Sequence, residues 1–196
     1  MLQLLYPSGK TPVLPSPRAY MVDTNDSAPA EILPVVEPSG EVVAQSDRSY
    51  IHSGSFLLHP VVHLHVINHW GDVFLQRRSA SKKLLPLYWD TAVGGHVSYG
   101  ESIVEALFRE ASEELSFTDF NPVFVEAYQY ESMTEKELVS VFVAIGEFDL
   151  HPFNDEVTEG RYWTSAQIES AKGKGILTPN FEYEYSRFKD KFEALL

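Results

Sequence analysis

Three glutamates in the middle of the chain have the spacing best suited to chemistry. Glu110, Glu113 and Glu114 stand at positions i, i+3 and i+4, so in a helix they share one face. Carboxylates this close repel one another by about 0.2–0.5 kcal/mol per pair. A hard divalent cation removes that repulsion and binds substrate phosphates as well. The spacing therefore leaves two alternatives, a site for Mg²⁺ and a polyphosphate or a solvated acidic face.

An amphipathic helix must carry these glutamates. Apolar residues at helical spacing fall on an arc that adjoins the carboxylates: Ile103, Val104, Leu107, Phe108, Ala111 and Leu115. This period predicts a helix over about residues 102–115 that packs with one face and presents its acids on the neighbouring face. Gly94 and Gly95 precede the helix and predict a glycine turn that leads into it.

The residue types over residues 95–117 resemble the Nudix box. Gly95 is followed by Glu101 after five intervening residues and by Arg109 after seven more. The resemblance implies that water attacks a phosphorus of a small diphosphate substrate while Mg²⁺ or Mn²⁺ offsets the developing charge. The metal ligands that it implies are the carbonyl of Gly95 and the carboxylates of Glu110, Glu113 and Glu114.

The resemblance also gives the other box residues a role. Arg109 would orient the glutamates by bidentate hydrogen bonding, and Glu101 would brace the loop against the helix. A glutamate such as Glu113 or Glu114, or a group elsewhere, would accept the proton of the water. Ser116 stands where the family usually has glycine, which leaves the conformation at the helix exit open.

Outside the box, about residues 35–190 resemble type I isopentenyl diphosphate isomerase, a branch of the Nudix fold. The match is carried by Gln76-Arg77-Arg78-Ser79-Ala80-Ser81-Lys82-Lys83, Pro86, Trp89, Gly95-His96, Gly100-Glu101-Ser102 and Glu135-Lys136-Glu137. In the isomerases three histidines and two glutamates hold a divalent metal. The resemblance therefore implies a second site for Mn²⁺, Zn²⁺ or Mg²⁺, formed by His52, His59, His96, Glu135 and Glu137. Taken singly, each histidine is more typical of a surface or core position.

Gly94 is the main departure from the isomerases, which have a cysteine just before the Gly-His pair. Moving a proton to or from carbon needs a placed acid and base, and glycine supplies neither. The full glutamate set also favours hydrolysis. The predicted function is a Nudix pyrophosphohydrolase that acts on nucleoside diphosphate derivatives or related compounds. The alternatives are an isomerase-like enzyme for isoprenoid diphosphates and a non-catalytic sensor, which has no evident need for the whole box.

The composition narrows the class of protein further. The chain has 196 residues, a formal net charge of −13 and no cysteine. The charge argues against a nucleic-acid partner, and the missing thiols exclude disulfides and cysteine-bound zinc. No apolar stretch approaches the length of a membrane span. We expect a cytoplasmic protein without membrane contact, and the Nudix resemblance leaves a homodimer open.

The remaining pattern predicts an α/β protein with a mixed sheet. Alternation and turn residues predict a hairpin over 32–36 and 41–44 and strands over 61–67, 73–76, 123–130, 137–145 and 161–163. Residues 89–93 lead into the glycines. Helices are predicted over 166–171 and 180–196. His63 and His65 should lie on a partly solvated strand face. The Nudix resemblance implies an α/β/α sandwich as one domain over residues 31–196, with residues 1–30 as a partly ordered arm.

Overall fold

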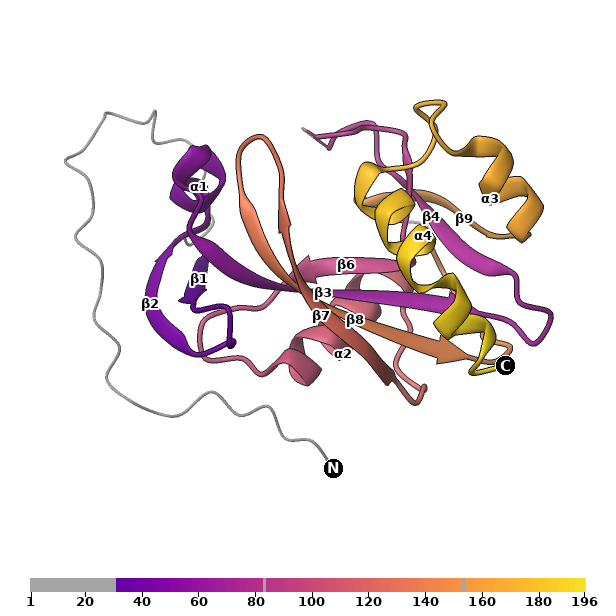
Figure 1. Ribbon diagram of the computed structural model, residues 1–196, viewed down its shortest axis with the longest axis horizontal. Coiled ribbons are helices and arrows are strands. Elements are labelled where there is room, and N and C mark those ends of the chain that lie inside the picture. Colours follow the sequence, from indigo (N-terminus) through magenta and orange to yellow (C-terminus); the bar gives the residue numbers. More distant parts are fainter. Residues whose placement is uncertain (1–30, 83, 153) are drawn as a thin grey trace. The chain divides into compact units, whose positions relative to one another are not determined.

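The computed structural model describes residues 31–82, 84–152 and 154–196. The predicted arm over residues 1–30 lies outside the described residues, as does Lys83. Figure 1 traces the elements in chain order. The strands are β1 (Ile32–Val36), β2 (Val42–Asp47), β3 (Leu58–Ile67), β4 (Val73–Arg78), β5 (Trp89–Asp90), β6 (Val93–His96), β7 (Val123–Glu131), β8 (Lys136–Ile145) and β9 (Val157–Trp163). The helices are α1 (Arg48–Tyr50), the π-helical turn η1 (Ile51–Ser55), α2 (Ile103–Leu115), α3 (Ser165–Ala171) and α4 (Pro179–Glu193).

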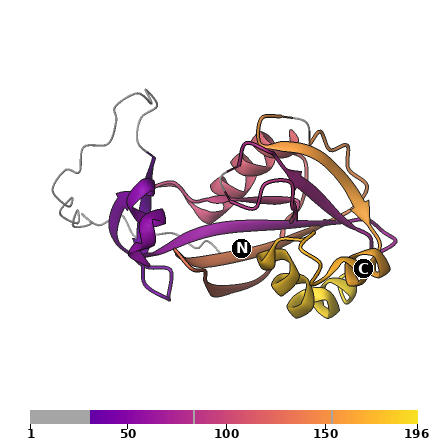
Figure 2. The same cartoon turned by 90° about the horizontal axis from the view of Figure 1, so that it is seen from above.

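Within these ranges the strands form two sheets. β1 and β2 pair antiparallel in the smaller sheet. The larger sheet has seven strands, with the order β5-β4-β3-β8-β7, and in addition β6 pairs with β3 and β9 with β4. Helices flank this mixed sheet, and Figure 2 shows α2 and α4 on opposite sides of it. The predicted α/β/α sandwich with an added N-terminal hairpin is confirmed.

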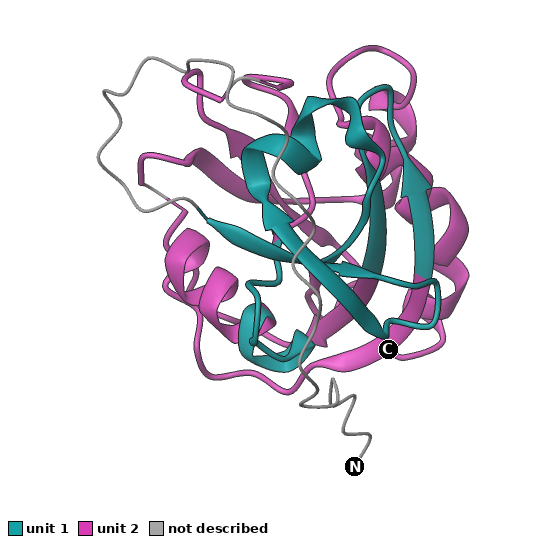
Figure 3. Cartoon of the chain, turned by 90° about the vertical axis from the view of Figure 1, so that its left-hand side faces the viewer, with its two compact units in different colours: residues 1–61, 96–106, 128–139 teal, residues 62–95, 107–127, 140–196 magenta. Residues whose placement is uncertain are grey.

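The chain divides into two compact units, which are coloured separately in Figure 3. Unit 1 combines the described residues up to 61 with residues 96–106 and 128–139, and unit 2 combines 62–95, 107–127 and 140–196. The division crosses β3, β6, α2, β7 and β8, so each unit brings together distant parts of the sequence. The single domain over residues 31–196 stays a prediction.

The hairpin of unit 1 turns at a glycine with a left-handed backbone. Gly40 has a φ of 85°, and its N–H donates to the carbonyl of Glu37 at 2.8 Å. The predicted hairpin is confirmed, although the second strand extends to Asp47. Four buried side chains of this hairpin and the following η1 pack together: Leu33, Val35, Ala44 and Ile51. Burial of each larger one contributes about 1.5–3 kcal/mol.

Antiparallel pairing sets the strand lengths of unit 2. β3 turns into β4 at Asn68, whose side-chain oxygen accepts the N–H groups of Trp70 and Asp72 at 3.0 and 2.9 Å. β4 then pairs with β9 from Val73↔Trp163 to Arg78↔Val157. β9 is consequently longer than the predicted strand over residues 161–163, because its partner extends the ladder beyond the local pattern.

The aromatic stripe near the C-terminus packs largely as predicted. Thr178 caps α4 by accepting the N–H of Phe181 at 3.3 Å. Four aromatic residues of the helix are buried: Phe181, Tyr185, Phe188 and Phe192. Leu195, predicted in the same stripe, is 44% exposed because α4 ends at Glu193. No helix in the described part of the chain has the length and apolar character needed to cross a membrane.

The exit of α2 forms without the family glycine. Ser116 itself takes the left-handed conformation, with a φ of 53°. The N–H of Ser116 donates to the carbonyl of Ser112 at 3.0 Å, and the next N–H, of Phe117, donates to the carbonyl of Ala111 at 3.0 Å, so two carbonyls near the helix end have partners. The side chain of Asn154 also donates to the carbonyl of Glu114 at 2.8 Å. Backbone and amide contacts therefore fix the exit despite the strained serine.

The prediction of a partly solvated face for the two histidines of β3 was wrong. His63 is 8% exposed and His65 is fully buried. Both rings contact Glu184, a fully buried residue of α4. The alternating pattern of β3 marks two polar positions, but it cannot show that a carboxylate about 120 residues later covers them.

Candidate active site

The helix that carries the three glutamates starts at a capping box. The hydroxyl of Ser102 accepts the N–H of Glu105 at 3.2 Å, and the Glu105 carboxylate accepts the N–H of Ser102 at 2.9 Å. This reciprocal pair satisfies donors that a helix N-terminus leaves open. The start of α2 at Ile103 then fixes the face on which the glutamates of the box lie.

Glu114 is the most buried member of the glutamate set, at 5% exposure. Its Oε2 accepts the Gly94 N–H at 3.1 Å and the Nε2–H of Gln76 at 3.0 Å. Burial, with a smaller contribution from the charge of Glu110, raises the pKa of Glu114 from 4.5 to about 8. Without a cation this carboxyl therefore holds a proton at neutral pH, and a bound cation would replace that proton.

Gln76 is a site residue that the sequence reasoning did not single out. It lies within β4, after three buried apolar residues, and is 4% exposed. Its Oε1 has no hydrogen-bond partner among the described residues, while its Nε2 holds Glu114. The available signal was a polar residue that ends the apolar run of β4. Such a residue on a buried strand needs a polar partner.

The predicted glycine turn was wrong, because Gly94 and Gly95 lie in strand β6, which extends the sheet up to His96. Glu110 lies directly against the second of these glycines. A Cβ at Gly95 would meet the carboxylate carbon of Glu110 at 2.0 Å and its oxygens at 2.2 and 2.4 Å. Any side chain at position 95 would therefore clash with the Glu110 carboxylate in its observed position. Burial raises the pKa of Glu110, and the hydrogen bond from Arg109 opposes the rise. We call this close packing of Gly95 and Glu110 the cradle, and its carboxylate oxygens are ligands that suit a hard cation.

Arg109 links the other two acids of the box. Its Nη1 donates to Oε1 of Glu110 at 2.8 Å and to Oε2 of Glu113 at 3.2 Å. Glu113 is the accessible member of the set, with a side chain that is 60% exposed. The guanidinium thus contacts two carboxylates through one nitrogen, and the orienting role expected for it stays a prediction.

Glu101 lies in unit 1, where it closes the loop before α2. Its carboxylate accepts the N–H of Ser98 at 3.0 Å, and its own N–H donates to the Ser98 carbonyl at 3.0 Å. Gly100 between them has a φ of 88°, a conformation that favours glycine. These contacts brace the loop locally.

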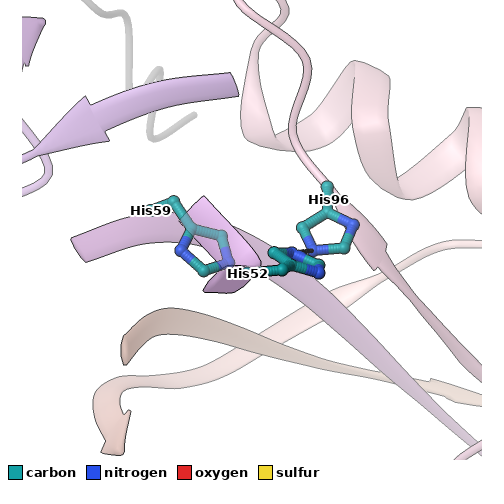
Figure 4. A group of neighbouring side chains, drawn as sticks. All are labelled: His52, His59 and His96. Carbon is teal, nitrogen blue, oxygen red and sulfur yellow. Dashed lines mark hydrogen bonds between the residues drawn. The ribbon is translucent and has the colours of Figure 1, made fainter. Parts of the chain in front are cut away.

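The three histidines predicted for a second metal site converge in unit 1, as Figure 4 shows. Nε2 of His52 and Nε2 of His96 are 3.1 Å apart. The ring of His59 lies 5.6 and 5.4 Å from those of His52 and His96. The turn η1, which the sequence reasoning missed, carries His52, whereas the other two rings project from strands β3 and β6.

Two carboxylates complete the same cluster. His59, Glu135 and Glu137 each offer a ligand atom within 4.8 Å of the other two. Nδ1 of His59 lies 3.2 Å from the carbonyl of Leu57, which places a proton on that nitrogen. The other nitrogen, Nε2, is buried with no hydrogen-bond partner in the described ranges. Three imidazoles and two carboxylates suit a divalent ion of the Mn²⁺ or Zn²⁺ kind.

Burial keeps two of these imidazoles in the form that binds metal. It lowers the pKa of both His52 and His59, and the nearby charge of Arg48 lowers that of His52 further. Both rings are therefore neutral at physiological pH, as metal ligation requires. The structure gathers all five predicted residues in unit 1, and it gathers the carboxylates of the box with Gly95 in unit 2.

Comparison with known proteins identifies the family. The NUDIX domain model matches residues 57–181. An uncharacterised Nudix hydrolase of Nostoc sp. is 39% identical over 120 residues, which cover 61% of this chain and 70% of that protein. An isopentenyl-diphosphate Delta-isomerase of Kocuria rhizophila is 33% identical over 146 residues, which cover 69% of this chain and 78% of the isomerase.

A solved structure shares the fold. The match is a protein of Deinococcus radiodurans, with a TM-score of 0.69 and 23% identity over 80% of this chain and 98% of that one. The domain match and the Nudix hydrolase relatives support a pyrophosphohydrolase. Together with the glutamate helix, the glycines of β6 and the isomerase-like histidines, these matches show that the chain belongs to the NUDIX family, in the branch that resembles isopentenyl diphosphate isomerase.

Proposed function

We propose that the protein hydrolyses the diphosphate linkage of a nucleoside diphosphate derivative or a related small molecule. Mg²⁺ or Mn²⁺ would be held by Glu110, Glu113, Glu114 and the carbonyl of Gly95. The observation that carries the proposal is Glu114, a buried carboxylate with a raised pKa that two N–H donors hold in place. Such a group is unfavourable without a cation and becomes a strong ligand with one.

The proposed reaction assigns a separate role to the metal, to Arg109 and to the residues that contact Glu114. A bound metal would polarise the phosphoryl oxygens and lower the pKa of the attacking water. Arg109 keeps Glu110 and Glu113 at hydrogen-bond distance, which limits their motion when the substrate arrives. Gly94 and Gln76 hold Glu114 from one side. The net charge of −13 favours metal-dependent binding of an anion and argues against a nucleic-acid substrate.

We also propose that the cluster in unit 1 binds a second divalent ion. The support is the buried Nε2 of His59, which has no hydrogen-bond partner among the residues described, and the convergence of His52, His96, Glu135 and Glu137 around it. An unsatisfied buried imidazole costs about 1–3 kcal/mol, and a metal ion would remove that cost.

Isomerisation of an isoprenoid diphosphate is the second candidate function. The cluster in unit 1 favours it, because the resemblance to the isomerases includes these five residues. Gly94 opposes it, since this position offers no acid or base to a carbon atom. Hydrolysis remains the better-supported proposal.

A panel of diphosphate compounds tests both functions together. The wild-type protein is incubated with nucleoside diphosphate derivatives and with isopentenyl diphosphate, in Mg²⁺ or Mn²⁺, and phosphate, monophosphate and isomer are measured. We expect metal-dependent hydrolysis that is lost in Glu113→Gln or Glu114→Gln without loss of folding. Full activity in both variants would remove the box from the mechanism. Isomerisation without hydrolysis would overturn the proposal.

A further inference from the structure

The side chain of Gln76 is held against the most buried glutamate of the Nudix box. Within unit 2, β4 pairs with a strand on each side at this position, in the registers Gln76↔Asp90 and Gln76↔Gly160. Neighbouring strands on both sides leave the backbone of Gln76 little freedom. The side chain itself is buried, with 4% exposure, and its Nε2 lies 3.0 Å from Oε2 of Glu114.

The two oxygens of Glu114 have different surroundings. Oε2 accepts the Nε2–H of Gln76 at 3.0 Å and the N–H of Gly94 at 3.1 Å. An ionised carboxylate has about two acceptor positions on each oxygen, so these two donors fill the positions on Oε2. None of the residues that the structure describes donates to Oε1. Oε1 is therefore the oxygen that Glu114 can offer to a cation.

The amide of Gln76 is satisfied on one side only. Its Nε2–H has Glu114 as acceptor, whereas its Oε1 is enclosed and has no hydrogen-bond partner in the described part of the chain. A buried amide oxygen without a partner is unfavourable. An apolar residue would avoid this cost, as buried Phe74 does on the same face of the strand. The contact that offsets the cost at position 76 is the one with Glu114.

We propose that Gln76 is a positioning residue for the cation of the Nudix box, because it holds Oε2 of Glu114 and so leaves Oε1 directed at that cation. The role rests on the proposed metal-dependent hydrolysis and adds a residue that lies outside the box. Carboxylates that bind a metal are themselves held by hydrogen bonds, and loss of such a partner weakens metal binding about 10- to 100-fold. A carboxylate that is already held also loses less conformational freedom when it binds.

Two methionine substitutions in the same strand form a matched pair. Gln76→Met keeps the length of the side chain but removes both the donor to Glu114 and the unpaired oxygen. Leu75→Met also places methionine in β4, on the opposite face, because successive side chains of a strand alternate. Leu75 is fully buried, and exchange of leucine for methionine is well tolerated, so this control reports the effect of packing alone. Gln76→Asn is a second test, since its shorter side chain keeps the amide but withdraws the donor from Glu114.

The test measures Mg²⁺ binding by calorimetry and thermal unfolding in a chelator. All proteins carry His59→Asn, so that an ion at the cluster in unit 1 does not contribute. We expect Gln76→Met and Gln76→Asn to weaken Mg²⁺ binding about tenfold or more, and Leu75→Met to bind like the His59→Asn parent. In the chelator, Gln76→Met should unfold at the temperature of the parent or above it, because the unpaired amide oxygen is gone. A purely structural residue would give the reverse, a lower unfolding temperature with unchanged affinity.

Two results would overturn the role of Gln76. Parental Mg²⁺ affinity in Gln76→Met would show that Glu114 binds the cation without this donor, and an equal loss in Leu75→Met would attribute the effect to packing of β4. If Gln76→Met does not fold, the affinity of Gln76→Asn decides the same question. A parent protein that does not bind Mg²⁺ would overturn the proposed metal site itself, which distinguishes the two failures.

Discussion

Replacement of Glu114 by glutamine should stabilise the metal-free protein while it removes activity. The side-chain oxygen of glutamine can accept the same two hydrogen bonds from Gly94 and Gln76, and the amide carries no charge to bury. The folded-state pKa of Glu114, about 8, lies above the ordinary 4.5. The native state therefore retains a proton that the unfolded chain releases, and stability falls as the pH rises from 4.5 towards 8.

The magnitude of this loss of stability follows from the free energy of about 1.4 kcal/mol per pH unit that one proton contributes. The destabilisation that glutamine would relieve is about 1 kcal/mol at pH 5.5, about 3 kcal/mol at pH 7 and about 5 kcal/mol at pH 9. Relaxation and water entry around the buried charge make these values upper bounds. For a chain of this size, 3 kcal/mol corresponds to roughly 6–12 °C in Tm.

Thermal unfolding in a chelator, at pH 5.5 and pH 9, measures the effect. The difference between Glu114→Gln and wild type should grow with pH, and added Mg²⁺ should stabilise the wild type far more than the variant. Glu113→Gln is the matched control, because its side chain is 60% exposed and its replacement should change stability little at either pH. A Glu114→Gln protein no more stable than wild type at pH 9 would refute the reasoning.

Three further predictions concern single positions. Ser116→Gly should raise the free energy of unfolding by about 1 kcal/mol in denaturant titrations, because glycine relieves the left-handed backbone; an unchanged midpoint would contradict the strain. Gly95→Ala should abolish Mg²⁺ binding in calorimetry, since its Cβ would displace the carboxylate of Glu110; retained affinity would reject the cradle. In equilibrium dialysis, Glu114→Gln should still bind Mn²⁺ at the cluster in unit 1, and adding His59→Asn to that variant should remove this ion. Mn²⁺ that stays bound to the variant with both changes would show that the second metal site does not include His59.

The glutamate helix could be predicted because its information is local. The 3.6-residue period of α2 fixes which residues pack, and the spacing of Glu110, Glu113 and Glu114 then puts the acids on one face. The exit at Ser116 could not be settled in the same way. It depends on the side chain of Asn154, which lies about 40 residues away.

Contacts between distant segments account for what the sequence could not predict. The burial of His63 and His65 depends on Glu184, which is 121 and 119 residues away. Gln76 and Glu114 are 38 residues apart in the sequence. The fold brings their side chains within hydrogen-bond distance, and only this contact makes Gln76 a site residue. The turn that carries His52 has no periodic pattern and relies on the left-handed Gly54. Only the resemblance to the isomerases anticipated that histidine.

Metal-dependent turnover by the wild type and Glu114→Gln is the most direct test of the central claim. The two proteins are compared on the diphosphate compound that the wild type cleaves best, in Mg²⁺ and in a chelator. The account predicts hydrolysis by the wild type only when the metal is present, and loss of that hydrolysis in a folded Glu114→Gln protein. Hydrolysis that persists in the chelator, or at the wild-type rate in Glu114→Gln, would contradict it.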